Sequence, residues 1–275
     1  MNTRILFTDL DGTLLNDQKE ITPGNRAAIE DALASGHKIV ISTGRPLASA
    51  KVQAERLGLT KEGCYAITYN GGQIYDMYHQ ETIYGQTLPA ALVPALFSAA
   101  ADRNLHIQTY SSTHILSEHE NEDLLSYAQI NKLPFQIVDH IGDALEGDPF
   151  KLIAISEKEP QKLLAFQDYL QKTYPDVLDS FFSSSTYLEI VPVGISKGFA
   201  VKWMCEYLGI PLENSVAAGD AQNDISMLEA AHIGAVMCNA FPGIAEHGNY
   251  ITKADNNHDG VAEIIRRFIL LEQPV

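Results

Sequence analysis

Two aspartates separated by one leucine follow a short apolar run near the N-terminus. Asp9 and Asp11 come directly after residues 5–8, and a third carboxylate, Asp220, closes the apolar run of residues 215–220. Such aspartates could cap a turn, hold a cation or divide the work of a reaction. Like charges in a half-buried cleft raise one another's pKa unless a cation intervenes. Carboxylate and carbonyl oxygens suit Mg²⁺, which would let Asp9 stay ionised and act as a nucleophile.

Donors that suit a phosphate group follow other apolar runs. Thr43 offers a hydroxyl, Gly44 offers a backbone N–H that a ligand can approach closely, and Asn223 offers an amide near a predicted helix start. Lys197 places a cation at the start of another predicted helix, where the helix dipole disfavours a positive charge. That mismatch favours a functional role for Lys197 over that of an ordinary surface lysine. Together these groups would meet the oxygens of a phosphate as charge shifts during its transfer.

The elements that position these residues alternate between strand and helix. The apolar runs predict strands at 5–8, 37–43 and 64–70, with helices at 23–35 and 47–57 between them. Thr22 and Pro23 open the first helix as its cap and first-turn proline, and Gly36 ends it. This order predicts a parallel sheet with right-handed crossovers, whose ligands bind beyond the C-terminal ends of the strands. Four strand ends therefore meet at one edge: Asp9 to Asp11, Thr43 to Arg45, Asn70 to Gly72, and Gly219 to Asp224.

The middle of the chain has a different pattern. Short strands are predicted at 106–110, 114–117, 135–139, 151–156, 181–185 and 187–191, with helices near 89–101, 120–131 and 159–173. Neighbouring strands separated by a few turn residues suggest antiparallel pairing. The α/β pattern then returns, with helices at 197–208, 226–231 and 259–271 and strands at 215–220 and 233–237. The sequence therefore predicts an α/β core interrupted by an α+β insert, with junctions near residues 84 and 190.

Composition narrows the classes of partner. Nineteen basic residues against 35 acidic ones give a net charge of −16, which argues against binding to nucleic acid or to an anionic membrane. The three cysteines form no CxxC pair and no zinc set, which indicates a reducing, cytoplasmic compartment. The uncharged run of residues 82–101 contains two prolines and fits a helix of a soluble protein better than a membrane span. A monomer is the default expectation.

Other phosphate and metal motifs do not fit. An EF-hand loop needs glycine at its sixth position, whereas Gly12 is the fourth residue counted from Asp9. No GxxxxGK[ST] or GxGxxG follows a predicted strand, and no GxSxG is present.

The ordered motifs resemble the haloacid dehalogenase-like (HAD) superfamily, in particular its Cof-type phosphatases and their bacterial sugar-phosphatase branch. The matching segments are DLDGT, STGRP, YNGG, LEIVPVGISKG, GDAQNDISML and NNHDGVAEII, in that order along the chain. The resemblance implies a Rossmann-like parallel-sheet core of residues 1–84 and 190–275 with an α+β cap domain at 85–189. It also implies a Mg²⁺-dependent phosphomonoester hydrolase that forms an aspartyl-phosphate and acts on sugar phosphates or similar small phosphorylated metabolites.

Site roles follow from the resemblance position by position. Asp9 matches the nucleophile and Asp11 the general acid/base, whose backbone carbonyl rather than its carboxylate usually meets the metal. Thr43 and Lys197 match the phosphate-binding hydroxyl and lysine of the catalytic set. The implied metal set is Asp9, Asp11, Asp220 and Asp224, the last as a ligand through water or a residue behind the ligands. The implied phosphate or substrate contacts are Leu10 and Gly44 through their backbone, with Thr43, Lys197, Asn223, Arg45 and Asn70.

Several alternatives stay open at this stage. Arg45 could form a salt bridge as well as contact the substrate. Asp224 could serve only as a carboxylate at a helix start. Asp259 and Gly260 could cap the last helix. His106, His114 and His119 of the insert suit polar surface or core positions better than substrate recognition. Ala245 and Cys238 depart from the family pattern outside the main motifs.

Two other functions compete with hydrolysis. A phosphomutase would pass the phosphate of the same aspartyl-phosphate to a sugar instead of to water. A non-catalytic binding protein is disfavoured because all four family motifs are intact. A dehalogenase is disfavoured by Asp11, because halide leaves without a proton.

Overall fold

The computed structural model describes residues 2–271, which form two compact units. Unit 1 comprises the described residues within 1–45, 50–84 and 196–275, and unit 2 comprises residues 46–49 and 85–195. No helix in the described part of the chain has the length and apolar character that crossing a membrane requires.

Unit 1 contains an eight-stranded sheet in the order β14-β13-β12-β1-β2-β3-β4-β5. The strands are β1 (Ile5–Thr8), β2 (Lys38–Ser42), β3 (Cys64–Thr68), β4 (Gln73–Asp76), β5 (Glu81–Gly85), β12 (Ser215–Gly219), β13 (Ile233–Val236) and β14 (Tyr250–Ile251). β1 lies at the centre, parallel to both neighbours, with Phe7 opposite Val40 on one side and Ala217 on the other. The predicted α/β class with a parallel core sheet is confirmed.

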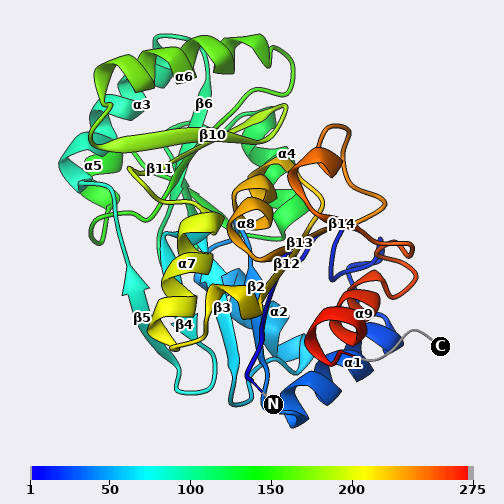
Figure 1. Cartoon of the computed structure of the whole chain (residues 1–275). Helices are drawn as coiled ribbons and strands as arrows, with labels where there is room; N and C mark the ends of the chain where they lie inside the picture. Colours follow the sequence, from blue (N-terminus) through cyan, green and yellow to red (C-terminus); the bar gives the residue numbers. More distant parts are fainter. Residues whose placement is uncertain (1, 272–275) are drawn as a thin grey trace. The chain divides into compact units, whose positions relative to one another are not determined.

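Helices pack on this sheet and on one another. They are α1 (Pro23–Ala34), α2 (Leu47–Leu57), α7 (Lys197–Tyr207), α8 (Ile225–Ala230) and α9 (Gly260–Ile264), which continues into the π-helical turn η6 (Ile265–Ile269). α7 contacts α8, and α1 contacts α9, the blue and red helices of Figure 1. Ile5 and Phe7 of β1 share one buried apolar cluster with Val201 and Met204 of α7. The central strand is therefore fixed by apolar packing as well as by its neighbours.

Unit 2 contains a six-stranded sheet in the order β10-β11-β9-β6-β7-β8. Its strands are β6 (His106–Tyr110), β7 (Ile115–Ser117), β8 (Phe135–Ile137), β9 (Leu152–Ile155), β10 (Leu178–Ser184) and β11 (Tyr187–Pro192). Its helices are α3 (Val93–Ala101), α4 (Glu122–Asn131), α5 (Ile141–Ala144) and α6 (Gln161–Thr173). Leu96 and Phe166, from α3 and α6, pack with Leu152 and Ile190 of the sheet in a separate buried cluster.

Some predicted elements differ from the structure. The third strand ends at Thr68 instead of residue 70, because Tyr69 and Asn70 take left-handed φ angles of 51° and 57°. The β4 and β5 strands were not predicted, and β4 is antiparallel to β3. Antiparallel pairing was expected for strands of the insert separated by a few turn residues; β7 and β8, which the predicted helix α4 separates, are parallel. Parallel neighbours need such a crossover connection.

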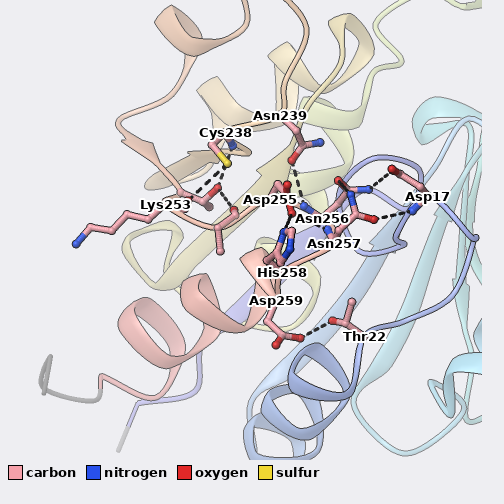
Figure 2. A network of polar contacts seen from close by, with 12 residues as sticks. Asp17, Thr22, Cys238, Asn239, Lys253, Asp255, Asn256, Asn257, His258 and Asp259 are labelled. Carbon is pink, nitrogen blue, oxygen red and sulfur yellow. Dashed lines mark hydrogen bonds and ion pairs between the residues drawn. The ribbon is translucent and has the colours of Figure 1, made fainter.

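The N-termini of α1 and α9 cap each other. Thr22 and Asp259 were predicted to cap their own helices, but neither side chain does so. Instead, Asp259 accepts a hydrogen bond from the backbone N–H of Asn25 (3.1 Å) and one from the Thr22 hydroxyl (2.5 Å; Figure 2). Asn25 returns a bond, because its Oδ1 accepts from the N–H of Ala262 at 2.7 Å. Each helix thus satisfies a first-turn N–H of the other.

Glycine is required at one point of this contact. A Cβ on Gly24 would lie 2.4 Å from the carboxyl group of Asp259, closer than any side chain can approach. The close approach of the two helix ends therefore depends on Gly24.

Candidate active site

The candidate site lies where four parallel strands of unit 1 end. Asp9 follows β1, Thr43 follows β2, Asn70 follows β3 and Asp220 follows β12. All four residues are buried, and Asp9 is the most exposed of them at 8%. The C-terminal ends of parallel strands face the same edge of a sheet, which is why these residues come together.

Three carboxylates meet one ammonium group at this edge. Ligand oxygens of Asp9, Asp220 and Asp224 lie within 4.8 Å of one another. Lys197 Nζ donates to Asp9 Oδ1 and to Asp224 Oδ1, each at 2.6 Å, and its side chain is completely buried. One ammonium does not balance three carboxylates, so the cluster has an excess of negative charge that a cation would neutralise.

Close backbone packing sets the position of Lys197. The side chain of Ser196 caps α7 by accepting from the N–H of Phe199 at 3.0 Å. Gly71 has a φ of 111°, and a Cβ there would lie 2.4 Å from the carbonyl oxygen of Ser196. A Cβ on Gly198 would lie 2.2 Å from the carbonyl oxygen of Ser226. The glycines therefore let the start of α7 approach the strand ends closely enough for Lys197 to reach Asp9.

Burial shifts the pKa values of this cluster. Burial, together with the charges of Asp224 and Asp220, raises the pKa of Asp9 well above its ordinary value, although Lys197 opposes the shift. Burial and the charge of Asp224 raise the pKa of Asp220 to about 7. Burial disfavours the ammonium form of Lys197, but its attraction to Asp224 and Asp9 outweighs burial and raises its pKa. These pKa shifts are those expected of a buried site that holds more carboxylates than cations.

Asp224, rather than Asp11, completes the buried carboxylate cluster. The expectation that Asp9, Asp11 and Asp220 would gather is corrected by the structure, which brings Asp224 to that place. Besides holding Lys197, Asp224 accepts from the backbone N–H groups of Asp220 (3.1 Å) and Ala221 (3.0 Å). It is therefore both a helix-start carboxylate and a member of the cluster.

The carboxylate of Asp11 is paired with two cations. Arg45 donates to its Oδ2 through Nη2 (2.7 Å) and Nε (3.1 Å), and Lys19 Nζ donates to its Oδ1 at 2.8 Å. Burial would raise the pKa of Asp11, but Arg45 and Lys19 outweigh it and lower that pKa. The salt-bridge alternative for Arg45 is thus what the structure shows, and its partner is a site residue. Lys19 was not predicted, because nothing in its local sequence links it to Asp11.

Asn70 carries a buried donor with no partner. Its Oδ1 accepts from Asn223 Nδ2 at 3.2 Å, whereas its own Nδ2 has no hydrogen-bond partner in the described part of the chain. Gly44 lies against it, because a Cβ on Gly44 would be 3.0 Å from Asn70 Oδ1. An unpaired buried N–H is unfavourable unless a ligand accepts from it. Asn70, Asn223 and Gly44 therefore lie together, as the predicted strand ends required.

Two further expected contacts are placed by the structure. The Leu10 side chain is fully buried, so only its backbone is available to a ligand, and its carbonyl accepts from Leu15 N–H at 2.8 Å. The Thr43 hydroxyl accepts from the N–H of Arg45 at 3.2 Å.

The histidines of the insert and the two residues that depart from the family pattern lie outside the carboxylate cluster. His106 is buried in unit 2 between Gln108 and Asn121, and burial lowers its pKa. The backbone N–H of Cys238 donates to Thr252 at 3.0 Å, and Ala245 lies in the short 3₁₀ turn η5. His114 and His119 lie on either side of β7 and bond to residues near them in the sequence, Thr113 and Ser117 respectively. None of them enters the carboxylate cluster.

Comparisons with known proteins identify similar chains. A family model described as haloacid dehalogenase-like hydrolase matches residues 6–265. The chain is 31% identical to 5-amino-6-(5-phospho-D-ribitylamino)uracil phosphatase YcsE of Bacillus subtilis, over 98% of this chain and 97% of that protein. It is 28% identical to pyridoxal phosphate phosphatase YbhA of Escherichia coli, over 96% of this chain and 98% of that protein. The structure resembles a haloacid dehalogenase-like hydrolase of Bacteroides thetaiotaomicron with a TM-score of 0.86 and 30% identity, covering 97% and 99% of the chains.

Proposed function

The chain belongs to the haloacid dehalogenase-like hydrolase family and is a phosphatase, and from that premise we propose that it is a Mg²⁺-dependent phosphomonoester hydrolase with Asp9 as its nucleophile. The observation that carries the proposal is the 2.6 Å ion pair between Asp9 and the buried Lys197. This pair favours the charged form of Asp9, against the burial that raises its pKa, at a strand end where the donors of Asn70 and Asn223 gather. A phosphate is the ligand that such a combination accepts.

The donor set fits a divalent cation with oxygen ligands. Asp9 Oδ2 and Asp220 Oδ2 accept no hydrogen bond from any described residue, whereas both oxygens of Asp224 are already engaged. Asp9 and Asp220 would therefore hold the ion directly, with Asp224 behind them and the backbone carbonyl of Asp11 as a further ligand implied by the family. When bound there, Mg²⁺ supplies positive charge to the carboxylates and to the phosphate.

The proposed reaction has two steps at Asp9. A carboxylate oxygen of Asp9 attacks phosphorus, the bond from phosphorus to the ester oxygen breaks, and Asp11 gives that oxygen its proton. Asp11 then takes a proton from the water that attacks the aspartyl-phosphate, which releases inorganic phosphate and restores Asp9. Because Arg45 and Lys19 lower its pKa, Asp11 is ionised, which is the form that its second task requires. Its first task requires that the contacts with Arg45 and Lys19 be given up.

Other residues hold the phosphate during both steps. Lys197 lies against the attacking carboxylate, and the unpaired amide of Asn70 and the amide of Asn223 are available as donors. Thr43 and Gly44 supply a hydroxyl and a backbone N–H, as the resemblance implies. Unit 2, inserted between β5 and α7, is the substrate-selecting cap in this proposal.

The substrate is a small phosphorylated metabolite. Sugar phosphates lead the proposal because the sequence resembles the sugar-phosphatase branch. The names of two relatives add a phosphorylated ribitylaminouracil and pyridoxal phosphate as candidates. A panel of such phosphomonoesters, assayed for phosphate release with and without Mg²⁺, identifies the class.

The test combines this panel with two variants. We expect Asp9→Asn to abolish phosphate release, while Asp102→Asn, an exposed aspartate of unit 2, retains it. Turnover retained by Asp9→Asn would contradict the nucleophile assignment. Chelated protein that regains nothing with Mg²⁺ would contradict the cofactor, and transfer of phosphate to a sugar, seen by phosphorus NMR, would indicate a mutase.

A further inference from the structure

The side chain of Asn239 holds the segment that follows Asp11. Asn239 lies in the loop after β13, and its Nδ2 donates to the carbonyl oxygen of Gly12 at 2.8 Å. Its Oδ1 accepts from the backbone N–H of Asn256 at 3.1 Å (Figure 2). Because both ends of the amide are engaged, its orientation is determined by its neighbours.

The loop that contains Asn256 holds the same segment at two further points. Asn256 is buried, and its Nδ2 donates to the carbonyl oxygen of Leu15 (3.0 Å) and to Asp17 (3.2 Å). Asn257 Oδ1 accepts from the backbone N–H of Asp17 at 3.1 Å, as Figure 2 shows. The segment of residues 12–17 is therefore fastened at Gly12, Leu15 and Asp17 by side chains of two loops.

This segment needs an external support at Gly12. Gly12 has a φ of +81°, and a Cβ there would lie 2.5 Å from Asp220 Oδ2. The next residue, Thr13, donates its hydroxyl to Asp220 Oδ1 at 2.7 Å. The backbone here is thus held by Asn239 at the carbonyl of Gly12, and by Asp220 through the side chain of Thr13. Gly12 follows Asp11 directly, so these contacts fix the backbone next to Asp11.

The same segment also controls one of the partners of Asp11. Residues 16–20 form a tight turn, in which the N–H of Asn16 donates to the carbonyl of Glu20 at 2.9 Å. This turn brings Lys19 back to the carboxylate of Asp11. The contacts that hold Leu15 and Asp17 therefore also fix the position of the Lys19 backbone.

We propose that Asn239 is a positioning residue for the proton transfer carried out by Asp11, acting through the carbonyl of Gly12. The inference rests on the proposed function, because the acid/base role of Asp11 belongs to it. Asn239 touches neither substrate nor metal in this proposal. Its effect appears in the steps where Asp11 transfers a proton, and of these only delivery to the departing oxygen depends on the leaving group.

The test compares two esters that differ in their need for that proton. A nitrophenolate leaves phosphorus unprotonated, whereas a sugar alkoxide needs a proton. The value of kcat/KM covers the reaction up to departure of the leaving group, so the later role of Asp11 as a base does not enter it. We expect Asn239→Ala to lower kcat/KM about tenfold more for a hexose 6-phosphate than for p-nitrophenyl phosphate.

The chain offers a matched control in Asn249. It is also exposed, donates through Nδ2 to the carbonyl of His232 (2.9 Å) and accepts from the N–H of Gly234 (3.0 Å), away from Asp11. Asn249→Ala should leave the ratio of the two kcat/KM values at that of the unsubstituted protein. Asn239→Asp keeps the acceptor for Asn256 but has no donor for Gly12, so it should shift the ratio as Asn239→Ala does.

The outcomes separate the two proposals. An equal fall for both esters in Asn239→Ala, or no fall, overturns the positioning role, as does a normal ratio in Asn239→Asp. Unsubstituted protein that releases phosphate from neither ester overturns the proposed function itself, and the inference with it.

Discussion

At the scale of single residues, Lys197 offsets the free-energy cost of burying the carboxylates of the site. It bonds to Asp9 and Asp224 with no solvent contact of its own. Removing one member of a buried ion pair leaves its partners charged and unpaired, which commonly costs about 3–5 kcal/mol. The same lysine therefore serves stability and, in the proposed function, the reaction.

We expect Lys197→Met to lower the free energy of unfolding by about 3–5 kcal/mol at neutral pH. The loss should shrink at about pH 5, because burial raises the pKa of Asp9 and lets that carboxyl take up a proton. Urea unfolding at the two pH values measures this. Lys202→Met, on the exposed side of the same helix, should change stability little at either pH, and an equal loss at both pH values for Lys197→Met would refute the argument.

The raised pKa of Asp220 predicts how the cation-free protein responds to pH. Its ordinary pKa is 3.8 and its pKa in the fold is about 7, so in that window the folded state keeps a proton that the unfolded chain has lost. The contribution of Asp220 to stability therefore falls as the pH rises from about 4 to about 7. A bound cation removes this penalty by neutralising the carboxylate.

Mg²⁺ should accordingly raise the Tm more at about pH 7.5 than at about pH 5, because at the lower pH the ion must displace the proton of Asp220. Thermal unfolding with chelator and with Mg²⁺ at both pH values checks the difference. Asp220→Asn should lose most of this pH dependence. An equal rise in Tm at both pH values would show that Asp220 does not hold the ion.

At the scale of elements, the mutual capping of α1 and α9 joins the two ends of unit 1. Asp259 lies at the N-termini of both helices, where the aligned peptide dipoles favour a negative charge. Its own φ of 65° is left-handed, so an alanine there would add backbone strain to the loss of the carboxylate. Glycine removes the carboxylate without that strain.

We expect Asp259→Gly to lower the free energy of unfolding by about 1–2 kcal/mol, the range for loss of a helix cap. Asp259→Asn keeps an acceptor but not the charge, so its free energy of unfolding should lie between those of Asp259→Gly and the unsubstituted protein. Denaturant unfolding measures both, with Asp31→Asn on the exposed face of α1 as the control. Stability equal to that of the unsubstituted protein in Asp259→Gly would mean that solvent replaces the cap without loss.

At the scale of the whole molecule, the two units have separate cores. Phe166 belongs to the buried cluster of unit 2, whereas Phe7 and Met204 belong to that of unit 1. The ends of the insert lie close together, since Gln86 Nε2 donates to the carbonyl of Val193 at 3.2 Å. A unit whose ends meet and whose core is its own is able to unfold separately.

We therefore expect Phe166→Ala, which removes about 3–5 kcal/mol of packing from unit 2, to separate the two unfolding transitions. The single tryptophan, Trp203, lies in α7 of unit 1, and its ring stacks on that of Tyr207 with 4.9 Å between the ring centroids. Its fluorescence therefore reports on unit 1. Circular dichroism of the variant should show an early transition that Trp203 does not follow. Coincident transitions by both probes would show that the units unfold as one.

The sequence by itself determined the elements whose signals are local. Apolar runs, the Thr22–Pro23 helix start and the Gly36 stop placed the helices of unit 1 to within a few residues, together with its strands β1, β2, β3, β12 and β13. The rule that ligands bind beyond the C-terminal ends of parallel strands then predicted that Asp9, Thr43, Asn70 and Asp220 end at one edge. These inferences needed only neighbouring residues and the chirality of the chain.

Only the tertiary structure decided which side chains at that edge touch. Asp224 took the place expected for Asp11, and Lys19 and Arg45 became the partners of Asp11. Asn239 reaches Gly12 from 227 residues away in the sequence. Side-chain contacts of this kind depend on sheet register and loop conformation, which long-range packing fixes and no local pattern records.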